Sequence, residues 1–301
     1  MSGRLNEVER TWCPGCGDFA ILDAVAAALD ELGLEPEQVA VVSGIGQAGK
    51  LPHYLHCNFL HGLHGRALAH ALGVRLASPE LTVIAVGGDG DIYGEGGNHL
   101  LHAFRRNPDI ACVVHNNGVY GLTKGQPAPT GAQGAVTRLS PHGTAAPAFN
   151  PLAAALAAGA TFVARGFAGA AEQLAGIIAA AVRHRGFGFV DVLQPCVSFN
   201  RVNTWQWYRE RVEPLADGHD PVDLDAAFRV ALEWPGGERI PTGIIYRVER
   251  AVFEDGFPAL RDRPGRGPGP DHPHPSLPLK GEGIEGRGRP ARLNRLAEEF
   301  R

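Results

Sequence analysis

The sequence predicts an α/β fold in which a doubly wound, mostly parallel β-sheet is covered by helices on both faces. Short apolar runs rich in β-branched residues, such as VAVVS at 39–43 and LTVIAV at 81–86, alternate with segments whose apolar residues recur at helical spacing. Runs that stay apolar on successive residues are typical of parallel strands buried on both faces. The segments between them serve as helical crossovers, which we expect to be right-handed.

Each element follows from its local pattern, taken from the start of the chain. Asp18 is expected to cap a first helix with apolar residues through Leu32, and Gly33 is expected to end it. Pro108 separates a later helix from the strand after it. Strands are expected at 39–43, 81–86, 110–114, 161–165 and 187–194, and further helices at 62–73, 95–106, 151–158 and 170–184.

The charge balance excludes some classes of partner. The 301 residues include 28 lysines and arginines and 32 acidic residues, which gives a net charge of −4. Such a balance does not favour binding to nucleic acids or anionic membranes. No apolar stretch reaches the roughly 18 residues of a membrane-spanning helix, and the polar start MSGRLNEVER differs from a signal peptide. We therefore expect a cytoplasmic protein with no nucleic-acid or membrane partner.

A change in composition near residue 257 divides the chain. Residues 1–256 are expected to form one domain, because apolar runs recur throughout them. Proline, glycine and charged residues dominate 257–290, so this segment lacks apolar residues for a core and is expected to be a disordered linker. A short C-terminal helix is expected at 291–301.

A glycine-rich acidic motif, AVGGDGDIYGEGGNHL, follows the strand expected at 81–86 and opens the next helix. Ligands of parallel sheets bind at this position, where glycines allow backbone N–H groups to approach a phosphate. Because Asp89 and Asp91 would repel a bare diphosphate, we expect a divalent cation beside them. Mg²⁺ prefers carboxylate, carbonyl and phosphate oxygens, so a further oxygen ligand is expected from a neighbouring strand end.

Two asparagines, Asn116 and Asn117, follow the strand at 110–114, one helix and one strand beyond the acidic motif. GDG followed at this spacing by NN resembles the signature of thiamine diphosphate enzymes. The resemblance implies the following ligands of Mg²⁺: Asp89, the side-chain oxygen of Asn117 and the carbonyl of Val119. It also implies the residues that line the diphosphate, Gly90 and Asp91.

A wider resemblance covers roughly residues 9–213 and continues more weakly to about 255. Six ordered blocks resemble the β subunit of 2-oxoacid:ferredoxin oxidoreductases: WCPGCGDFAIL, SGIGQAGKLPHYLHCN, GLHGRAL, GGDGDIYGEGGNHLLHAFRRNPDI, NNGVYGLTKGQPAPT and QPCVSFN. The resemblance implies a sheet of the thiamine diphosphate-binding type. It also implies an oxidoreductase that converts a 2-oxoacid and coenzyme A to acyl-CoA and CO2 and passes the electrons to ferredoxin.

The substrate is less sharply indicated than the reaction. The blocks GLTKGQ and QPCVSFN look nearest to 2-oxoglutarate-type subunits, while pyruvate and branched-chain 2-oxoacids stay open. Lys124 and Arg201 are either carboxylate-binding residues or solvated loop charges.

The cofactor blocks also indicate a partner subunit. Thiamine is usually activated by a glutamate hydrogen-bonded to its aminopyrimidine. Among these blocks Glu95 is the only glutamate near the expected cofactor position, and it follows the phosphate-binding loop. We therefore expect that acid to come from an α subunit, as the family resemblance also implies.

The resemblance further implies a set of cofactor contacts: Ile45, Gly46, Gln47, Ala48, His64, Gly65, Gly121 and Leu122. His64 is the candidate catalytic residue, since a neutral imidazole can donate a hydrogen bond to a substrate or phosphate oxygen. The alternative is a histidine at a helix start that is bonded to the backbone. Arg66 beside it either binds phosphate or pairs with a surface acid.

A CxxC turn, Cys13 to Cys16, brings two thiols close together. By itself the turn fits a zinc site, a redox dithiol or an iron–sulfur cluster. Zinc normally needs a second CxxC or paired histidines, and neither is evident. The family resemblance implies a [4Fe–4S] cluster with Cys196 as its third ligand.

The fourth ligand of such a cluster is open, because Gln47 in SGIGQ stands where many relatives have cysteine. Cys57 is the candidate replacement; otherwise a ligand is missing or is not a cysteine, or the cluster has been lost. Cys112, inside an expected strand, is expected to be a buried apolar residue.

Two other functions remain to be weighed. One is a thiamine diphosphate-dependent decarboxylase subunit that lacks an iron–sulfur cluster. The other is a structural metal-binding protein in which the CxxC turn only stabilises the fold. This hypothesis leaves the motifs GDGD and NN unexplained.

Overall fold

The computed structural model describes residues 3–137, 139–234 and 238–257. The helices are α1 (Gly17–Glu31), α2 (Ala67–Ala77), α3 (Gly97–Arg106), α4 (Pro151–Ala157), α5 (Ala171–Arg183), α6 (Trp205–Arg209) and α7 (Leu224–Leu232). The strands are β1 (Val39–Ser43), β2 (Asn58–His61), β3 (Thr82–Gly88), β4 (Ile110–Asn116), β5 (Val119–Tyr120), β6 (Gln126–Pro127), β7 (Phe162–Phe167), β8 (Phe187–Leu193), β9 (Val212–Pro214) and β10 (Ile240–Arg247). Shorter helical turns are η1 (Pro36–Gln38), η2 (Ala48–Tyr54), the π-helical η3 (Gly90–Glu95) and η4 (Phe253–Gly256).

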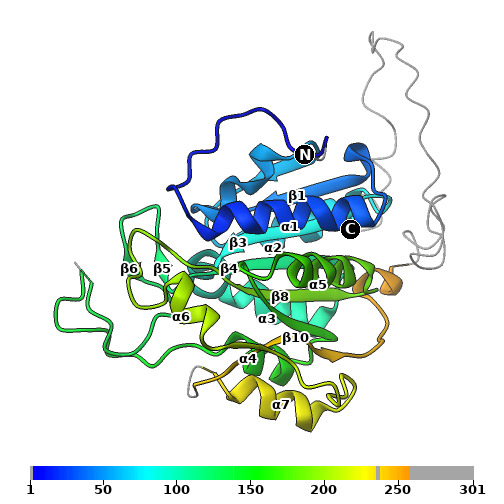
Figure 1. The fold of residues 1–301 in the computed structure, drawn as a ribbon. Coiled ribbons are helices and arrows are strands. Elements are labelled where there is room, and N and C mark those ends of the chain that lie inside the picture. Colours follow the sequence, from blue (N-terminus) through cyan, green and yellow to red (C-terminus); the bar gives the residue numbers. More distant parts are fainter. Residues whose placement is uncertain (1–2, 138, 235–237, 258–301) are drawn as a thin grey trace, which may run out of the picture.

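An eight-stranded sheet forms the centre of the fold, in the order β2-β1-β3-β4-β8-β7-β10-β9 (Figure 1). The strands from β2 to β7 in this order pair in parallel, whereas β10 pairs antiparallel with β7 and carries β9 parallel to itself. The mostly parallel α/β fold predicted from the sequence is therefore confirmed. β5 and β6 form a separate antiparallel pair.

Helices cover both faces of the sheet. α1 and α5 bury their apolar sides against one face, while α2, α3, α4 and α7 cover the other (Figure 1). On the second face Phe104 packs edge-on against Phe187 and Phe189, and all three are fully buried. Burying a side chain of this size contributes about 1.5–3 kcal/mol. Cys112 lies in this core with no exposed surface, as expected for a buried apolar residue.

Two local expectations are wrong. Asp18 does not cap α1, because the helix begins at Gly17 and Asp18 is buried in its first turn, where it accepts a hydrogen bond from Nδ1 of His115 at 2.6 Å. The helix expected at 62–73 begins only at Ala67. Gly65 before it has a φ of 70° and donates its amide to a side chain, which keeps this segment out of the helix.

The linker expected at 257–290 lies outside the described residues except for its first residue, and so does the helix expected at 291–301. Among the helices that the structure describes, none has the length and apolar character needed to cross a membrane.

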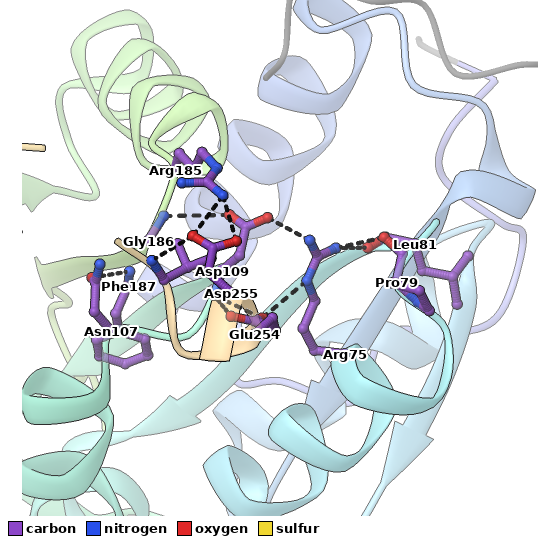
Figure 2. Close-up of polar contacts among 11 residues, drawn as sticks. Arg75, Pro79, Leu81, Asn107, Asp109, Arg185, Gly186, Phe187, Glu254 and Asp255 are labelled. Atoms are coloured by element: carbon purple, nitrogen blue, oxygen red, sulfur yellow. Dashed lines mark hydrogen bonds and ion pairs between the residues drawn. The ribbon is translucent and has the colours of Figure 1, made fainter. Parts of the chain in front are cut away.

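A buried ion-pair network joins η4 to the amino ends of the strands (Figure 2). Glu254 is fully buried and accepts hydrogen bonds from Nε of Arg75 at 3.2 Å and from the backbone amide of Asp109 at 3.1 Å. The Arg75 guanidinium also contacts the Asp109 carboxylate at 2.6 Å and donates to the carbonyls of Pro79 and Leu81. One guanidinium thus joins α2, the start of β4 and the C-terminal turn.

We predict that Glu254→Ala lowers the free energy of unfolding by about 3–5 kcal/mol, because it leaves the Arg75 guanidinium in a largely buried site with one partner fewer. Urea unfolding of the purified chain measures the change. The matched control is Glu249→Ala, an exposed residue of the same segment, which should change the free energy by about 0.5 kcal/mol or less. Equal losses in the two variants would contradict the prediction.

Candidate functional site

Three loops that follow neighbouring parallel strands meet at the carboxyl edge of the sheet. Residues 44–48 follow β1, residues 89–96 follow β3 and residues 117–122 follow β4. This edge is where open α/β sheets bind their ligands. The cofactor and Mg²⁺ residues predicted from the sequence lie mainly on these three loops, and hydrogen bonds connect them.

Asp89 follows β3 and is 1% exposed. Its Oδ2 atom accepts a hydrogen bond from the amide of Gly118 at 2.9 Å and lies 2.5 Å from the hydroxyl of Thr130. Burial raises the pKa of the Asp89 carboxyl to about 7, although hydrogen bonds from Thr130, Gly118 and Gly90 act in the opposite direction. A divalent cation beside such a group would favour its charged form, so Asp89 fits the role of a Mg²⁺ ligand.

Asn117 and Val119 form a tight turn against this carboxylate. Nδ2 of Asn117 donates to Oε1 of Gln194 at 2.6 Å, and Oδ1 accepts from the amide of Val119 at 3.0 Å. Gln194 thereby fixes which end of the amide is oxygen. Because Gly118 of the same turn donates to Asp89, a carboxylate, an amide oxygen and a backbone carbonyl belong to one compact unit. These donor types suit Mg²⁺.

Asp91, in the loop after β3, connects this loop with those after β1 and β2. Its Oδ1 atom accepts hydrogen bonds from the amides of Ile45 at 3.2 Å and Gly65 at 2.7 Å, and from Nδ1 of His64 at 2.6 Å. A Cβ atom on Gly44 would collide with the same carboxylate, which explains why glycine is needed there. Burial raises the pKa of the Asp91 carboxyl, and these three donors lower it. Its other oxygen, Oδ2, is buried with no hydrogen-bond partner among the described residues.

His64 lies at the rim of the site with 39% of its side chain exposed. Its Nδ1 is bonded to the Asp91 carboxylate rather than to the backbone, so the backbone-bonded alternative does not hold. An ionised carboxylate only accepts hydrogen bonds, so Nδ1 carries a hydrogen and Nε2 of the neutral ring is the basic nitrogen. The His64 ring lies 6.1 Å from that of Tyr120, in an edge-on orientation.

Glycines bring backbone close to other groups in these loops. A Cβ atom on Gly90 would collide with the ring of Tyr120, whose hydroxyl donates to the Gly90 carbonyl at 3.3 Å. Gly46 has a φ of 130°, a conformation that side chains disfavour. Ala48 is buried at the start of η2.

Gln47, Gly121 and Leu122 differ in their surroundings. The Gln47 carbonyl accepts a hydrogen bond from the indole of Trp12 at 2.8 Å, and its side-chain Oε1 is buried with no partner among the described residues. A Cβ atom on Gly121 would lie 3.6 Å from Cγ of Gln47, so the loops after β1 and β4 approach each other here. Leu122 is 42% exposed.

Three of the candidate cluster cysteines lie at the same edge. Cys16 at the start of α1 accepts a hydrogen bond from Nε2 of Gln194 at 3.3 Å, two residues before Cys196. The hydroxyl of Ser198 donates to the Cys13 sulfur at 3.1 Å. Burial raises the pKa of the Cys16 thiol well above its usual value, and the charge of Asp18 adds to this. Gln194 thus links the Asn117 turn directly to a candidate cluster ligand.

Cys57 lies apart from these three. It immediately precedes β2, at the amino end of a strand that runs parallel to β1, whereas Cys196 follows the carboxyl end of β8. Burial raises the pKa of the Cys57 thiol to about 11, while a backbone hydrogen bond from Val41 and the charge of Arg4 lower it. Within the described part of the chain, no three side chains of His, Cys, Asp or Glu lie close enough together to hold a metal ion. The described side chains therefore do not form a complete cluster site.

Sequence reasoning missed three residues of this site: Tyr120, Thr130 and Gln194. Gln194 and Thr130 hold the predicted Mg²⁺ ligands, and Tyr120 packs on Gly90. Two of them could have been found from their position in the sequence. Gln194 directly follows β8, and Thr130 ends the block GLTKGQPAPT. A polar residue directly after a buried strand is the general form of this signal.

Comparison with known proteins identifies the family. A model of the thiamine pyrophosphate enzyme C-terminal TPP-binding domain matches residues 38–192. A model of the C-terminal part of the pyruvate ferredoxin oxidoreductase beta subunit matches residues 196–262. The boundary between the two matches falls just after β8, next to Cys196.

Individual relatives belong to the same family that the two models indicate. The 2-oxoacid:ferredoxin oxidoreductase subunit beta of Sulfolobus sp is 45% identical over 251 residues, covering 79% of this chain and 82% of the relative. The 2-oxoglutarate synthase subunit KorB of Archaeoglobus fulgidus is 44% identical over 229 residues, covering 74% and 85%.

A solved structure is similar along most of the chain. It is a 2-oxoglutarate:ferredoxin oxidoreductase from Magnetococcus marinus with 2-oxoglutarate, coenzyme A and succinyl-CoA bound, and it matches with a TM-score of 0.83 and 40% identity. The match covers 86% of this chain and 88% of that one. The chain belongs to the β subunits of the 2-oxoacid:ferredoxin oxidoreductases, which are thiamine diphosphate-dependent oxidoreductases.

Proposed function

We propose that this β subunit, together with its α subunit, catalyses the oxidative decarboxylation of 2-oxoglutarate to succinyl-CoA and CO2, with ferredoxin as the electron acceptor. The observation that carries the proposal is the contact between Asp89 and the turn of Asn117, Gly118 and Val119. It supports the proposal because it joins the two loops that carry the proposed oxygen ligands of Mg²⁺. The choice of 2-oxoglutarate is supported by two of the similar proteins, the 2-oxoglutarate synthase subunit of Archaeoglobus fulgidus and the 2-oxoglutarate:ferredoxin oxidoreductase of Magnetococcus marinus.

The chain's own residues would bind and orient the cofactor. Asp89, Asn117 and the Val119 carbonyl would hold Mg²⁺, and Gly90 would line the diphosphate. The remaining cofactor contacts are proposed on the surrounding loops: Ile45, Gly46, Gln47, Ala48, His64, Gly65, Asp91, Gly121 and Leu122. When bound, thiamine diphosphate supplies the electron sink that allows the 2-oxoacid carboxylate to leave as CO2.

His64 is the proposed catalytic residue. The Asp91 carboxylate holds its Nδ1 atom, so the ring is fixed in one orientation and its Nε2 nitrogen is the one available to a ligand. At the rim of the site this nitrogen can accept a proton from a substrate or, when protonated, donate a hydrogen bond to one of its oxygens. Asp91 thereby sets both the tautomer and the position of the catalytic ring.

A [4Fe–4S] cluster is proposed at the corner occupied by Cys13, Cys16 and Cys196, with Cys57 as the candidate fourth ligand. The link from Asn117 through Gln194 to Cys16 supports this proposal, since it connects one of the three thiols to the proposed cofactor loops. The position of Cys57 at the amino end of β2 instead favours the alternative function, a thiamine diphosphate-dependent decarboxylase subunit without a cluster.

We predict that the chain alone is inactive and gains activity when co-purified with its α subunit, because the cofactor loops offer only Glu95, which follows the proposed phosphate-binding residues, and no second glutamate to activate thiamine. Turnover with a panel of 2-oxoacids, coenzyme A and ferredoxin measures this, and 2-oxoglutarate should give the highest kcat/KM. Full turnover by the single chain would refute the need for a partner. Preference for pyruvate would refute the substrate assignment alone.

We predict that Asp89→Ala weakens Mg²⁺-dependent thiamine diphosphate binding by more than about 100-fold, since it removes a metal ligand rather than a residue behind one. Asn117→Ala should weaken binding in the same direction. Calorimetry on the complex measures both affinities, and circular dichroism checks the fold. Asp225→Ala, on α7 and outside the site, is the control and should bind as the parent does. Unchanged affinity in both site variants would end the assignment.

We predict that anaerobically prepared complex contains about four irons per β chain, with broad visible thiolate-to-iron absorption. If Cys57 is a ligand, Cys57→Ser loses iron or converts the cluster to a three-iron form. Cys112→Ser is the control and should keep its iron. Unchanged iron in Cys57→Ser would remove that residue from the ligand set, and complete absence of iron after reconstitution would favour the decarboxylase.

A further inference from the structure

Thr130 bridges two residues of the carboxyl edge. Its hydroxyl lies 2.5 Å from Oδ2 of Asp89 and 2.7 Å from Oδ1 of Asn116, and its side chain is buried. Asp89 is a proposed metal ligand, whereas Asn116 precedes the proposed ligand Asn117 in the chain. Because a hydroxyl has one hydrogen, Thr130 donates to one of these two acceptors at a time and its oxygen contacts the other, and it thereby connects the loop after β3 with the end of β4.

A hydrogen bond to Asp191 fixes the orientation of the Asn116 side chain. Its Nδ2 atom donates to Oδ1 of Asp191 at 2.9 Å, so its oxygen must face Thr130. The hydroxyl of Tyr93, from η3, donates to the same Asp191 oxygen at 2.7 Å. Rotation of the Asn116 amide would place its oxygen against the Asp191 carboxylate, which cannot donate a hydrogen bond to it.

Asp191 is held in turn by a buried charge. Nε of Arg165, on the neighbouring strand β7, donates to Oδ2 of Asp191 at 3.1 Å, and both side chains are fully buried. The Arg165 guanidinium lies over the ring of Trp234 at 4.8 Å, and neither of its Nη atoms has a hydrogen-bond partner among the described residues. An unpaired buried charge is costly, so this guanidinium holds the Asp191 carboxylate in place.

We propose that Thr130 is a positioning residue for the metal site, fixing the Asp89 carboxylate in the orientation needed to bind a divalent cation. The proposal rests on the function proposed above. Arg165, Asp191 and Asn116 form a rigid support behind the hydroxyl, and Thr130 transmits their position to Asp89. The amide of Gly118 reaches the same Asp89 oxygen as Thr130, so two donors define the plane of the carboxylate.

The choice of metal makes this orientation matter. Mg²⁺ demands near-ideal octahedral geometry, so a rotated carboxylate binds it poorly. Residues that hydrogen-bond to metal ligands typically contribute 10–100-fold to metal affinity. Loss of the Thr130 hydroxyl should therefore weaken cation binding even when the ligand itself is intact.

The test is a Mg²⁺ titration of the co-purified α and β subunits at a fixed concentration of thiamine diphosphate, followed by calorimetry. Thr130→Val removes the hydroxyl and keeps the side-chain shape; Thr130→Ala removes it with less bulk, should the first variant be insoluble. Thr130→Ser restores the hydroxyl. Thr161→Val is the matched control: Thr161 is a buried threonine that lies 2.6 Å from Oδ1 of Asn107 and 2.8 Å from Nε2 of His184, outside the loops of the site.

We expect Thr130→Val and Thr130→Ala to weaken the apparent Mg²⁺ affinity by about tenfold and Thr130→Ser to recover most of it. Thr161→Val should lower the melting temperature of the cofactor-free complex without changing Mg²⁺ affinity. Unchanged affinity on loss of the Thr130 hydroxyl, or an equal loss in Thr161→Val, would overturn the role of Thr130. If the unmodified complex does not bind the cofactor with Mg²⁺, the proposed function fails, and this inference fails with it.

Discussion

Two buried carboxylates, two residues apart, determine the arrangement of the whole carboxyl edge. Asp89 lies between β3 and the π-helical turn η3, whereas Asp91 lies inside that turn, and the two carboxylates contact different neighbours. Asp91 is surrounded by donors from the loops after β1 and β2, and so it holds those loops together. Asp89 faces the loop after β4 instead. One carboxylate therefore organises the protein, while its neighbour is the proposed cation ligand.

The polar interior of the sheet complements this division. Arg165 and Asp191 lie side by side on β7 and β8, inside a fold whose strands are otherwise largely apolar. A buried ion pair of this kind is weak evidence for stability, since apolar replacements often do as well. Here the ion pair serves to orient other side chains. Asp191 accepts hydrogen bonds from Asn116 and Tyr93, and both of these residues lie in or next to the loops of the site.

Much of this arrangement could be predicted from the sequence, because parallel strands carry a strong apolar signal and their carboxyl ends must share an edge. The core strands β1, β3, β4, β7 and β8 follow from that rule, and so do the neighbouring positions of GDGD and NN at the carboxyl edge. The exposed edge strand β2, the short strand β9 and the antiparallel strand β10 were not predicted, since short or half-exposed strands lack a continuous apolar run. Aspartate is a common helix-capping residue, yet the Asp18 side chain is hydrogen-bonded to buried His115 instead. This contact joins residues 97 positions apart, so no local sequence pattern could predict it.

The ion-pair network around Glu254 has a practical consequence for handling the protein. It holds η4 against the amino ends of the strands (Figure 2), whereas the loops of the site follow the carboxyl ends. An affinity tag or a surface linkage introduced just after Phe257 would be attached on the side of the amino ends. A molecule immobilised in this way would present its carboxyl edge, with the partly exposed ring of His64, to solution.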